Sequence, residues 1–253
     1  QVFGTGLVET SDNLGVSGAL PSHPKLLDYL TLRFIDNGWQ VKPIIRLMML
    51  SGAWRQRSTQ TAGSVKALNT DPENRLLWRM NLRQLDSEYV RDAILAASGK
   101  LDRTVLGPFV PLDARADGMV VIKTKGLPTP TTEWRRSIYV LARRNYHLTM
   151  LRVFGQPIVA RNCTVRKPAA IVTQSLTLLH DDFVLQQADY FAERVIADAG
   201  NAVPKQVAAA FRIAVGRSPT EDEEKLSIEL VQRQRDRYEA QKPESDAARM
   251  ALA

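Results

Sequence analysis

Apolar residues at helical spacing, bounded by start and stop signals, constrain the fold of this chain more than any other feature. The clearest case covers residues 182–199 and is followed by Gly200. Its apolar residues recur every three or four positions: Val184, Leu185, Ala188, Phe191, Ala192, Val195 and Ile196. This spacing places them on one face of a helix, and glycine favours the left-handed backbone that ends one. The segment is predicted to be a long amphipathic helix.

Similar signals predict further helices along the chain. Prolines, serines and aspartates mark the starts, and Asn-Gly or Gly marks the ends. Helices are expected over 22–36, 42–57, 71–80, 86–98, 172–180, 204–215 and from Ser218 onward, where Ser-Pro-Thr-Glu is typical of a capping box with Pro at the first helical position. The apolar stripe over 42–57 is so broad that this helix is expected to be central in the core.

The pattern changes between about residues 101 and 144. Two short β-rich runs, 118–125 and 136–142, flank a turn-forming Gly-Leu-Pro-Thr-Pro segment. The predicted fold is therefore mainly α, an irregular multi-helix bundle with a small inserted antiparallel β element at about 117–143. We expect one domain over 1–253, made of a helical part 20–100, the β insertion 101–146 and a helical part 147–253. Both termini read as truncated, which suggests a fragment of a longer chain.

Composition and missing motifs exclude several classes of function. No apolar run approaches the roughly 18 residues that a membrane-spanning helix needs. The three histidines, His23, His147 and His180, lie far apart with no metal-ligand spacing, so no metal is expected. Haem-attachment, dinucleotide, phosphate-loop and nucleophile-elbow motifs are absent as well, so no cofactor is expected in this fragment. The formal net charge of +7 and a pI near 9.7 favour polyanionic partners only weakly.

Basic residues are densest around the predicted β element, and aromatic residues interleave with them. Arginine beside aromatics suits capture of phosphate, sulfate or carboxylate and stacking on sugars or bases. The candidate anion-binding residues are Arg135, Arg136, Arg143, Arg144, Arg152, Arg161, Arg166, Lys167 and Tyr146. Alternatively, these arginines pair with acidic residues of the helices, namely Asp86, Glu88, Asp92, Asp181 and Asp182, or lie in water.

No catalytic residue is predicted. Cys163 lies among basic residues that could lower its thiol pKa, which makes it a candidate reactive thiol, but a buried structural cysteine is the commoner outcome. As the single cysteine of the chain it forms no internal disulfide. Asp181 and Asp182 are adjacent at a helix start, where capping is the ordinary role of aspartate.

Together these segments resemble a known family, the planctomycete-type C-terminal domain of unknown function from large, secreted multidomain proteins that often begin with a cytochrome-c-like domain. The resemblance runs nearly end to end. It is carried by residues 3–8 (FGTGLV), 21–28 (PSHPKLLD), 38–39 (GW), 42, 46–47 (RL), 51, 55–56 (RQ), 71–79 (DPENRLLWR), 91–93 (RDA), 135–139 (RRSIY), 174–179 (QSLTLL) and 216–220 (GRSPT). It implies an extracytoplasmic bacterial protein, with further domains and haem c elsewhere in the polypeptide, and no known reaction.

Three functions remain open from the sequence. The favoured one is a non-catalytic scaffold or interaction domain of a larger, cytochrome-linked envelope protein, whose partners are other domains of the same polypeptide or an acidic protein. The alternative is an enzyme or binding module for acidic polysaccharide that uses the arginine and aromatic residues. Nucleic-acid binding is less favoured, because the resemblance implies a secreted location.

Overall fold

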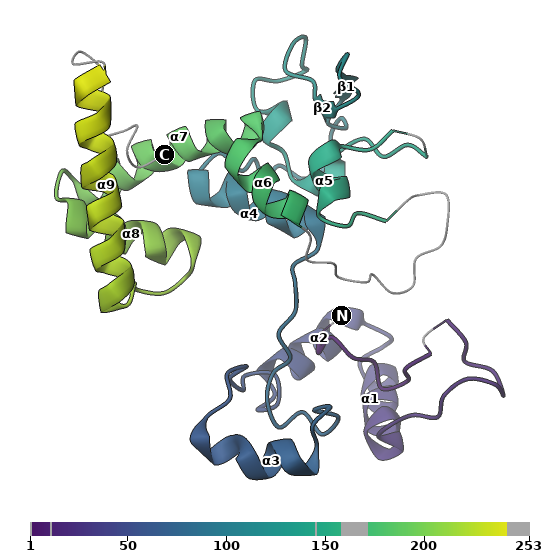
Figure 1. Ribbon diagram of the computed structural model, residues 1–253. Coiled ribbons are helices and arrows are strands. Elements are labelled where there is room, and N and C mark those ends of the chain that lie inside the picture. The colour runs from purple at the N-terminus through teal and green to yellow at the C-terminus, as the bar shows by residue number, and fades with distance from the viewer. Residues whose placement is uncertain (1, 11, 145, 158–171, 242–253) are drawn as a thin grey trace. The chain divides into compact units, whose positions relative to one another are not determined.

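A computed structural model describes residues 2–10, 12–144, 146–157 and 172–241 (Figure 1). These residues form two compact units, and the division falls between Gln84 and Leu85. We call the described residues up to Gln84 the N-terminal unit and those from Leu85 the C-terminal unit. The division lies inside the predicted helical part 20–100. The single domain stays a prediction, because two compact units can still unfold together.

Helices dominate the described residues, which contain nine α-helices and one two-stranded antiparallel sheet. The predicted fold class, mainly α with a small β element, is confirmed. None of the helices in the described ranges is long and apolar enough to cross a membrane.

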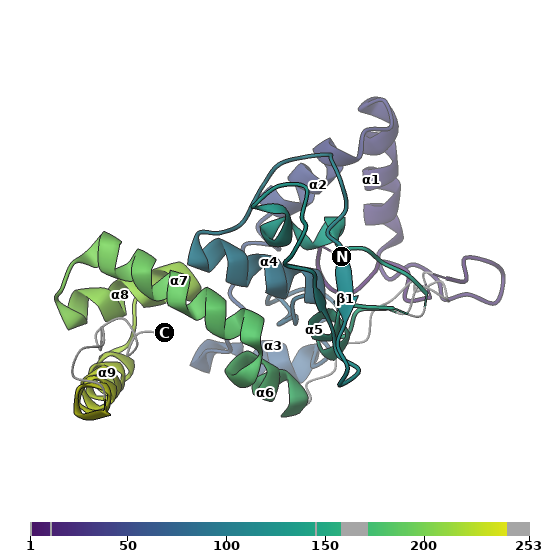
Figure 2. The ribbon, with the colours of Figure 1, turned by 90° about the horizontal axis from the view of Figure 1, so that it is seen from above.

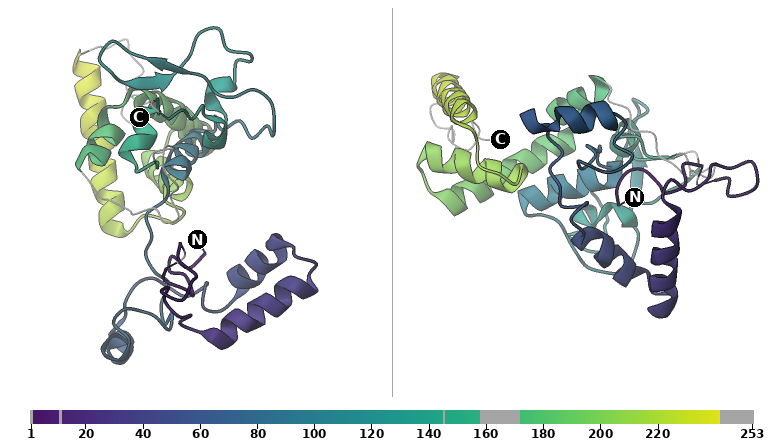
Figure 3. Two further views of the ribbon diagram at one scale, coloured as in Figure 1. Left: turned by 90° about the vertical axis from the view of Figure 1, so that its right-hand side faces the viewer. Right: turned by 90° about the horizontal axis from the view of Figure 1, so that it is seen from below.

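The N-terminal unit contains α1 (Pro24–Asp36), α2 (Val41–Leu50) and α3 (Val65–Thr70), the last preceded by a 3-10 turn, Ala62–Ser64. α1 begins with proline in its first turn and ends where Gly38 takes a φ of 64°, as predicted. α1 and α2 pack side by side (Figure 3). Their half-buried residues recur at helical spacing, Leu27, Leu30 and Phe34 on α1 and Ile44 and Met48 on α2.

Two helix predictions in this unit are wrong in extent or place. The helix expected over 42–57 ends at Leu50, where the Ser51 hydroxyl donates to the Met48 carbonyl at 2.6 Å and accepts from the Trp54 amide at 3.2 Å. The helix expected from Asp71 does not form: residues 71–80 consist of turns and irregular backbone, and the preceding helix, α3, ends at Thr70. Serine and aspartate side chains that bond nearby backbone groups stabilise turns in competition with helix.

The C-terminal unit contains α4 (Ser87–Ser98), α5 (Thr149–Val153), α6 (Val172–His180), α7 (Asp182–Ala199), α8 (Val203–Ala214) and α9 (Glu221–Gln241). α7 contacts α4, α6 and α8, and α8 contacts α9 (Figure 2). The predictions for α4, α6, α7 and α8 are confirmed to within a residue or two, and Asp181 caps α7 by accepting the Phe183 amide at 2.9 Å.

The start of α9 differs from its prediction by two residues. Thr220, not Ser218, caps the helix, and Pro219 precedes it. The Thr220 hydroxyl accepts the Glu223 amide at 3.3 Å while the Glu223 carboxylate accepts the Thr220 amide at 2.8 Å. This reciprocal pair is a capping box.

The small sheet pairs β1 (Leu112–Ala114) with β2 (Val120–Ile122), and Leu112 lies opposite Ile122. The predicted run 118–125 contains β2, but its partner β1 precedes the predicted element, and the second run, 136–142, is not a strand. It begins with a 3-10 turn, Ser137–Tyr139. The Asp92 carboxylate of α4 accepts the Ser137 amide at 2.7 Å, so a side chain takes a backbone group that a strand would pair.

Every buried hydrophobic residue in the described ranges belongs to the C-terminal unit. One cluster joins β1 to α5 through Leu112, Leu148, Met150 and Leu151. A second set lies on α7 and on the two helices α4 and α8 that pack on it: Leu95, Ala192, Val195, Val207 and Ala209. The helix predicted to be central in the core, α2, has no buried residue, so that expectation is wrong for the structure described.

Candidate interaction surface

Arg135, the first candidate anion-binding residue, is used within the fold. It is 4% exposed, and its guanidinium donates to the carbonyl oxygens of Pro108 and Leu106 and lies 4.0 Å from the centre of the Tyr139 ring. Leu106 and Gly107, inside this loop, have positive φ values of 67° and 93°. Arg135 therefore holds the 104–108 loop in a tight turn, and its donors face backbone rather than a ligand.

The remaining candidates separate into exposed residues and residues outside the described ranges. Arg136, Arg143, Arg144 and Arg152 are exposed, and Tyr146 is half-buried and pairs by an isolated bridge with Arg143. Arg161, Cys163, Arg166 and Lys167 lie outside the described residues. The structure thus brings Arg143 and Tyr146 together, and the anion site and the reactive thiol stay predictions.

Arg91 is the most deeply buried cation of the described residues, and it is not among the site residues predicted from the sequence. Its guanidinium donates to the carbonyls of Arg135 at 2.9 Å and Glu133 at 2.6 Å and to the Ser137 hydroxyl at 3.2 Å. It also lies over the Phe183 ring, 5.3 Å from the ring centre. A signal was present, because Arg91 falls in phase with Ser87, Leu95 and Ser98 on the buried face of α4.

Burial lowers the pKa of Arg91 to about 10, with Asp92 and Glu133 acting in the opposite direction. The group stays protonated at neutral pH. Because Arg91 is 0% exposed and its donors meet the 133–137 segment, it clamps that segment to α4 and offers no open side to an anion. Burial also raises the pKa of Glu133.

Two of the acidic residues that were predicted to pair with the candidate arginines form ion pairs with other arginines instead. Asp92 lies 3.9 Å from Arg91, and Asp182 lies 3.2 Å from Arg115. Histidine, cysteine and carboxylate side chains form no group of three that could hold a metal within the described part of the chain.

The N-terminal unit has the opposite character. Its sole buried residue, among those described, is Asn74. Large hydrophobic side chains stay exposed on both α1 and α2, including Leu32 at 61% and Leu50 at 58%. Apolar side chains exposed together on one surface, rather than singly, are typical of a binding site.

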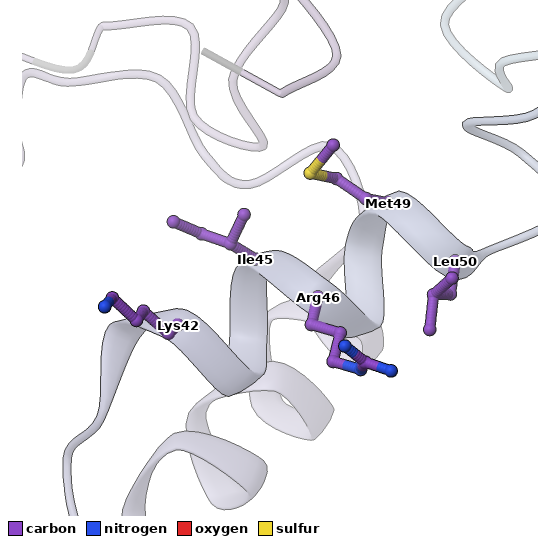
Figure 4. Close-up of a pocket in the computed structure, with 5 residues that line it drawn as sticks. All are labelled: Lys42, Ile45, Arg46, Met49 and Leu50. Atoms are coloured by element: carbon purple, nitrogen blue, oxygen red, sulfur yellow. The ribbon is translucent and has the colours of Figure 1, made fainter. Parts of the chain in front are cut away.

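One part of this surface is hollowed. Lys42, Ile45, Arg46, Met49 and Leu50 line a groove on α2 of about 330 Å³, which we call the α2 groove (Figure 4). These positions follow the i, i+3, i+4, i+7, i+8 spacing of a single helix face. Figure 4 shows Ile45 and Met49 projecting to the same side of the helix. The face opposite the half-buried Ile44 and Met48 therefore also carries apolar side chains, and its two cations, Lys42 and Arg46, lie between them.

Comparisons with known proteins identify a family whose function is unknown. A family model described as PSD1, a protein of unknown function (DUF1553), matches residues 1–231. Comparison with curated proteins and with solved structures finds no match. Since the family model covers most of the chain, this chain belongs to the PSD1 family of proteins of unknown function (DUF1553).

Proposed function

We propose that this chain is a non-catalytic interaction domain, in which the C-terminal unit is the stable support and the N-terminal unit carries the docking surface. One observation carries the proposal: α2 is apolar on two faces but buries no residue. A helix that is apolar around most of its circumference is normally enclosed by protein. A partner that covers the α2 groove would supply this enclosure.

The energy available from covering this surface is substantial. Ile45, Met49 and Leu50 are 38%, 40% and 58% exposed. Complete burial of one such side chain is worth about 1.5–3 kcal/mol, so covering these partly exposed groups contributes a few kcal/mol of burial energy, which offsets part of the entropic cost of association. The most enclosed cation of the described residues, Arg91, bonds the backbone of its own chain, so it is a structural group and not part of a ligand site.

Thiol labelling of the natural full-length polypeptide in its source cells tests this proposal. Met49→Cys, in a Cys163→Ser background, is expected to react with a maleimide more slowly there than in the purified 253-residue chain. Lys66→Cys, on the exposed side of α3 in the same unit, is the control and is expected to react equally in both. Equal labelling of Met49→Cys in both settings contradicts a covering partner.

The wider setting of the domain is also a proposal. We infer that it belongs to a larger extracytoplasmic, cytochrome-linked polypeptide, with haem c in another part of that chain. The support is the resemblance to planctomycete-type secreted proteins. A haem-stained gel and a visible spectrum of the native polypeptide test it: a Soret band with covalently retained haem is expected, and its absence contradicts the link.

A second candidate function, binding of acidic polysaccharide, is favoured by one observation. Arg136, Arg143, Arg144 and Arg152 all stay exposed. Guanidinium groups bind sulfate and carboxylate through paired hydrogen bonds. If the exposed arginines form such a site, Arg143→Ala with Arg144→Ala lowers affinity for heparin markedly at physiological salt, whereas unchanged affinity rules out their part in it.

A further inference from the structure

The α2 groove has a definite chemical pattern as well as an apolar surface. α2 contains only two ionisable residues, Lys42 and Arg46, and both are cations that line the groove. Neither forms an ion pair with another described residue. They are four residues apart, so both lie on the same side of the helix and about 6 Å apart along its axis.

The apolar part of the groove fits side chains of another helix. Ile45 and Met49 form one i, i+4 row and project to one side of the helix, and Leu50 ends the adjacent row that begins with Lys42 and Arg46. Rows of this kind receive the i, i+3, i+4 and i+7 side chains of an amphipathic helix. The unbranched side chain of Met49 adapts to differently shaped partners. α2 has 10 residues, which is about 15 Å, so a partner helix of about three turns covers it.

We propose that the α2 groove binds an acidic amphipathic helix of a partner polypeptide. Aliphatic side chains of that helix pack on Ile45, Met49 and Leu50, and carboxylates four residues apart pair with Lys42 and Arg46. This inference rests on the proposed interaction function and specifies the chemistry of its partner.

Other occupants fit the groove less well. A second copy of α2 placed on the first brings four cations together and supplies no acid, because α2 has none. An anionic lipid surface is normally bound by clusters of four to eight basic residues, whereas the groove has two. A helix that combines leucines with glutamates satisfies both the apolar row and the two cations.

A pair of synthetic helical peptides tests the inference on the whole 253-residue chain. The acidic peptide has leucines at i, i+4 and i+7 and glutamates at two flanking positions four residues apart, and the basic peptide has lysines in place of those glutamates. Fluorescence anisotropy is expected to show the acidic peptide bound about tenfold more tightly than the basic one. Lys42→Glu with Arg46→Glu is expected to reverse this preference.

The control is Lys25→Glu with Lys66→Glu, which makes the same charge change at exposed positions of α1 and α3, outside the groove. It is expected to keep the preference for the acidic peptide. A second variant, Met49→Asp, is expected to weaken the acidic peptide at least about tenfold, with an unchanged circular dichroism spectrum that confirms folding.

Several results overturn the inference. They are equal binding of the two peptides, an equal loss of preference in the control variant, preferential binding to phosphatidylserine vesicles, and self-association that Met49→Asp abolishes. Failure of the proposed function gives a different result, since Met49→Cys is then labelled freely in the source cells whatever the peptides do.

Discussion

α2 and α4 are helices of similar length that the two units use in opposite ways. α4 is the less apolar of the two, yet it buries Ser87, Arg91, Leu95 and Ser98. α2 is apolar at most positions and buries nothing. The apolar content of a helix therefore shows how much of its surface is favourable to bury, whereas its actual burial depends on the elements that surround it. In the C-terminal unit α5, α7 and the 133–139 segment surround α4.

The N-terminal unit relies on polar side chains where the C-terminal unit relies on a core. The Asp71 carboxylate accepts the amides of Arg75 and Leu76 at 2.9 and 2.8 Å. Asn74 donates to the Arg79 carbonyl at 2.8 Å and to Asn81 at 2.8 Å, and accepts the Arg79 amide at 3.2 Å. These bonds form a local turn without enclosing apolar surface.

The largest effect is expected at the clamp of the C-terminal unit. Arg91→Ala removes the donors of three acceptors and leaves a cavity beside Phe183, so it is expected to lower the free energy of unfolding by about 4 kcal/mol. Urea denaturation measures it. The control Arg136→Ala, at an exposed neighbour, is expected to change stability by less than about 0.5 kcal/mol. Equal effects of the two variants contradict the clamp.

A matched pair of leucines compares the two units directly. Leu151 is 0% exposed in the C-terminal core and Leu50 is 58% exposed on α2. Leu151→Ala is expected to cost about 3 kcal/mol because it leaves a cavity. Leu50→Ala is expected to cost less than about 0.5 kcal/mol. Thermal and urea unfolding of the two variants measure these changes in the free energy of unfolding. A large decrease for Leu50→Ala would contradict an open α2, because it would show that the chain itself encloses this helix.

Asn74→Ala tests how much the polar bonds of the 71–81 turn stabilise the N-terminal unit. Asn74 is 2% exposed and has a φ of 56°, a conformation that asparagine tolerates better than alanine. Loss of its bonds and the added strain are expected to cost about 2 kcal/mol. Hydrogen exchange is expected to show faster exchange in the 71–81 turn and unchanged exchange in α4 and α7. If amide exchange becomes faster to the same extent in both units, the bonds of Asn74 do not stabilise the 71–81 turn independently of the C-terminal unit.

The smallest effect concerns the exposed start of α9. Hydrogen bonds from Arg217 lower the pKa of Glu223 to about 2. Because the folded pKa lies below the ordinary value of 4.5, this pair stabilises the fold above about pH 4.5 and the contribution is lost as the pH falls towards 2. Arg217→Ala is expected to raise the pKa of Glu223 in an NMR titration, and Arg212→Ala, one helix earlier, is expected to leave it unchanged.

The sequence predicted the structural features that depend on interactions between residues close together in the chain. The starts and ends of α4, α6, α7 and α8 followed from caps, glycines and apolar spacing. Asp71 was misread because aspartate caps helices and forms turns by the same hydrogen bonds. The 136–142 run was predicted as a strand, because local spacing does not reveal that Ser137 bonds Arg91 and Asp92, which lie more than 40 positions away in the sequence.

The site was predicted less well than the fold. Arginines next to aromatics suggested an anion site, but Arg135 bonds the carbonyls of its own loop, which no spacing rule reveals. The width of the apolar stripe on α2 was read correctly. The exposure of α2 could not be predicted, since a sequence pattern does not show whether an apolar helix is covered by its own chain or by another molecule.

Native-state hydrogen exchange of the 253-residue chain tests the central claim, that a closed core supports an open docking surface. The account predicts that amides of α4 and α7 exchange only through global unfolding, whereas amides of α2 exchange through local opening at least about tenfold faster. Protection of α2 equal to that of α4 and α7 would contradict the account, because it would place α2 inside the same cooperative core.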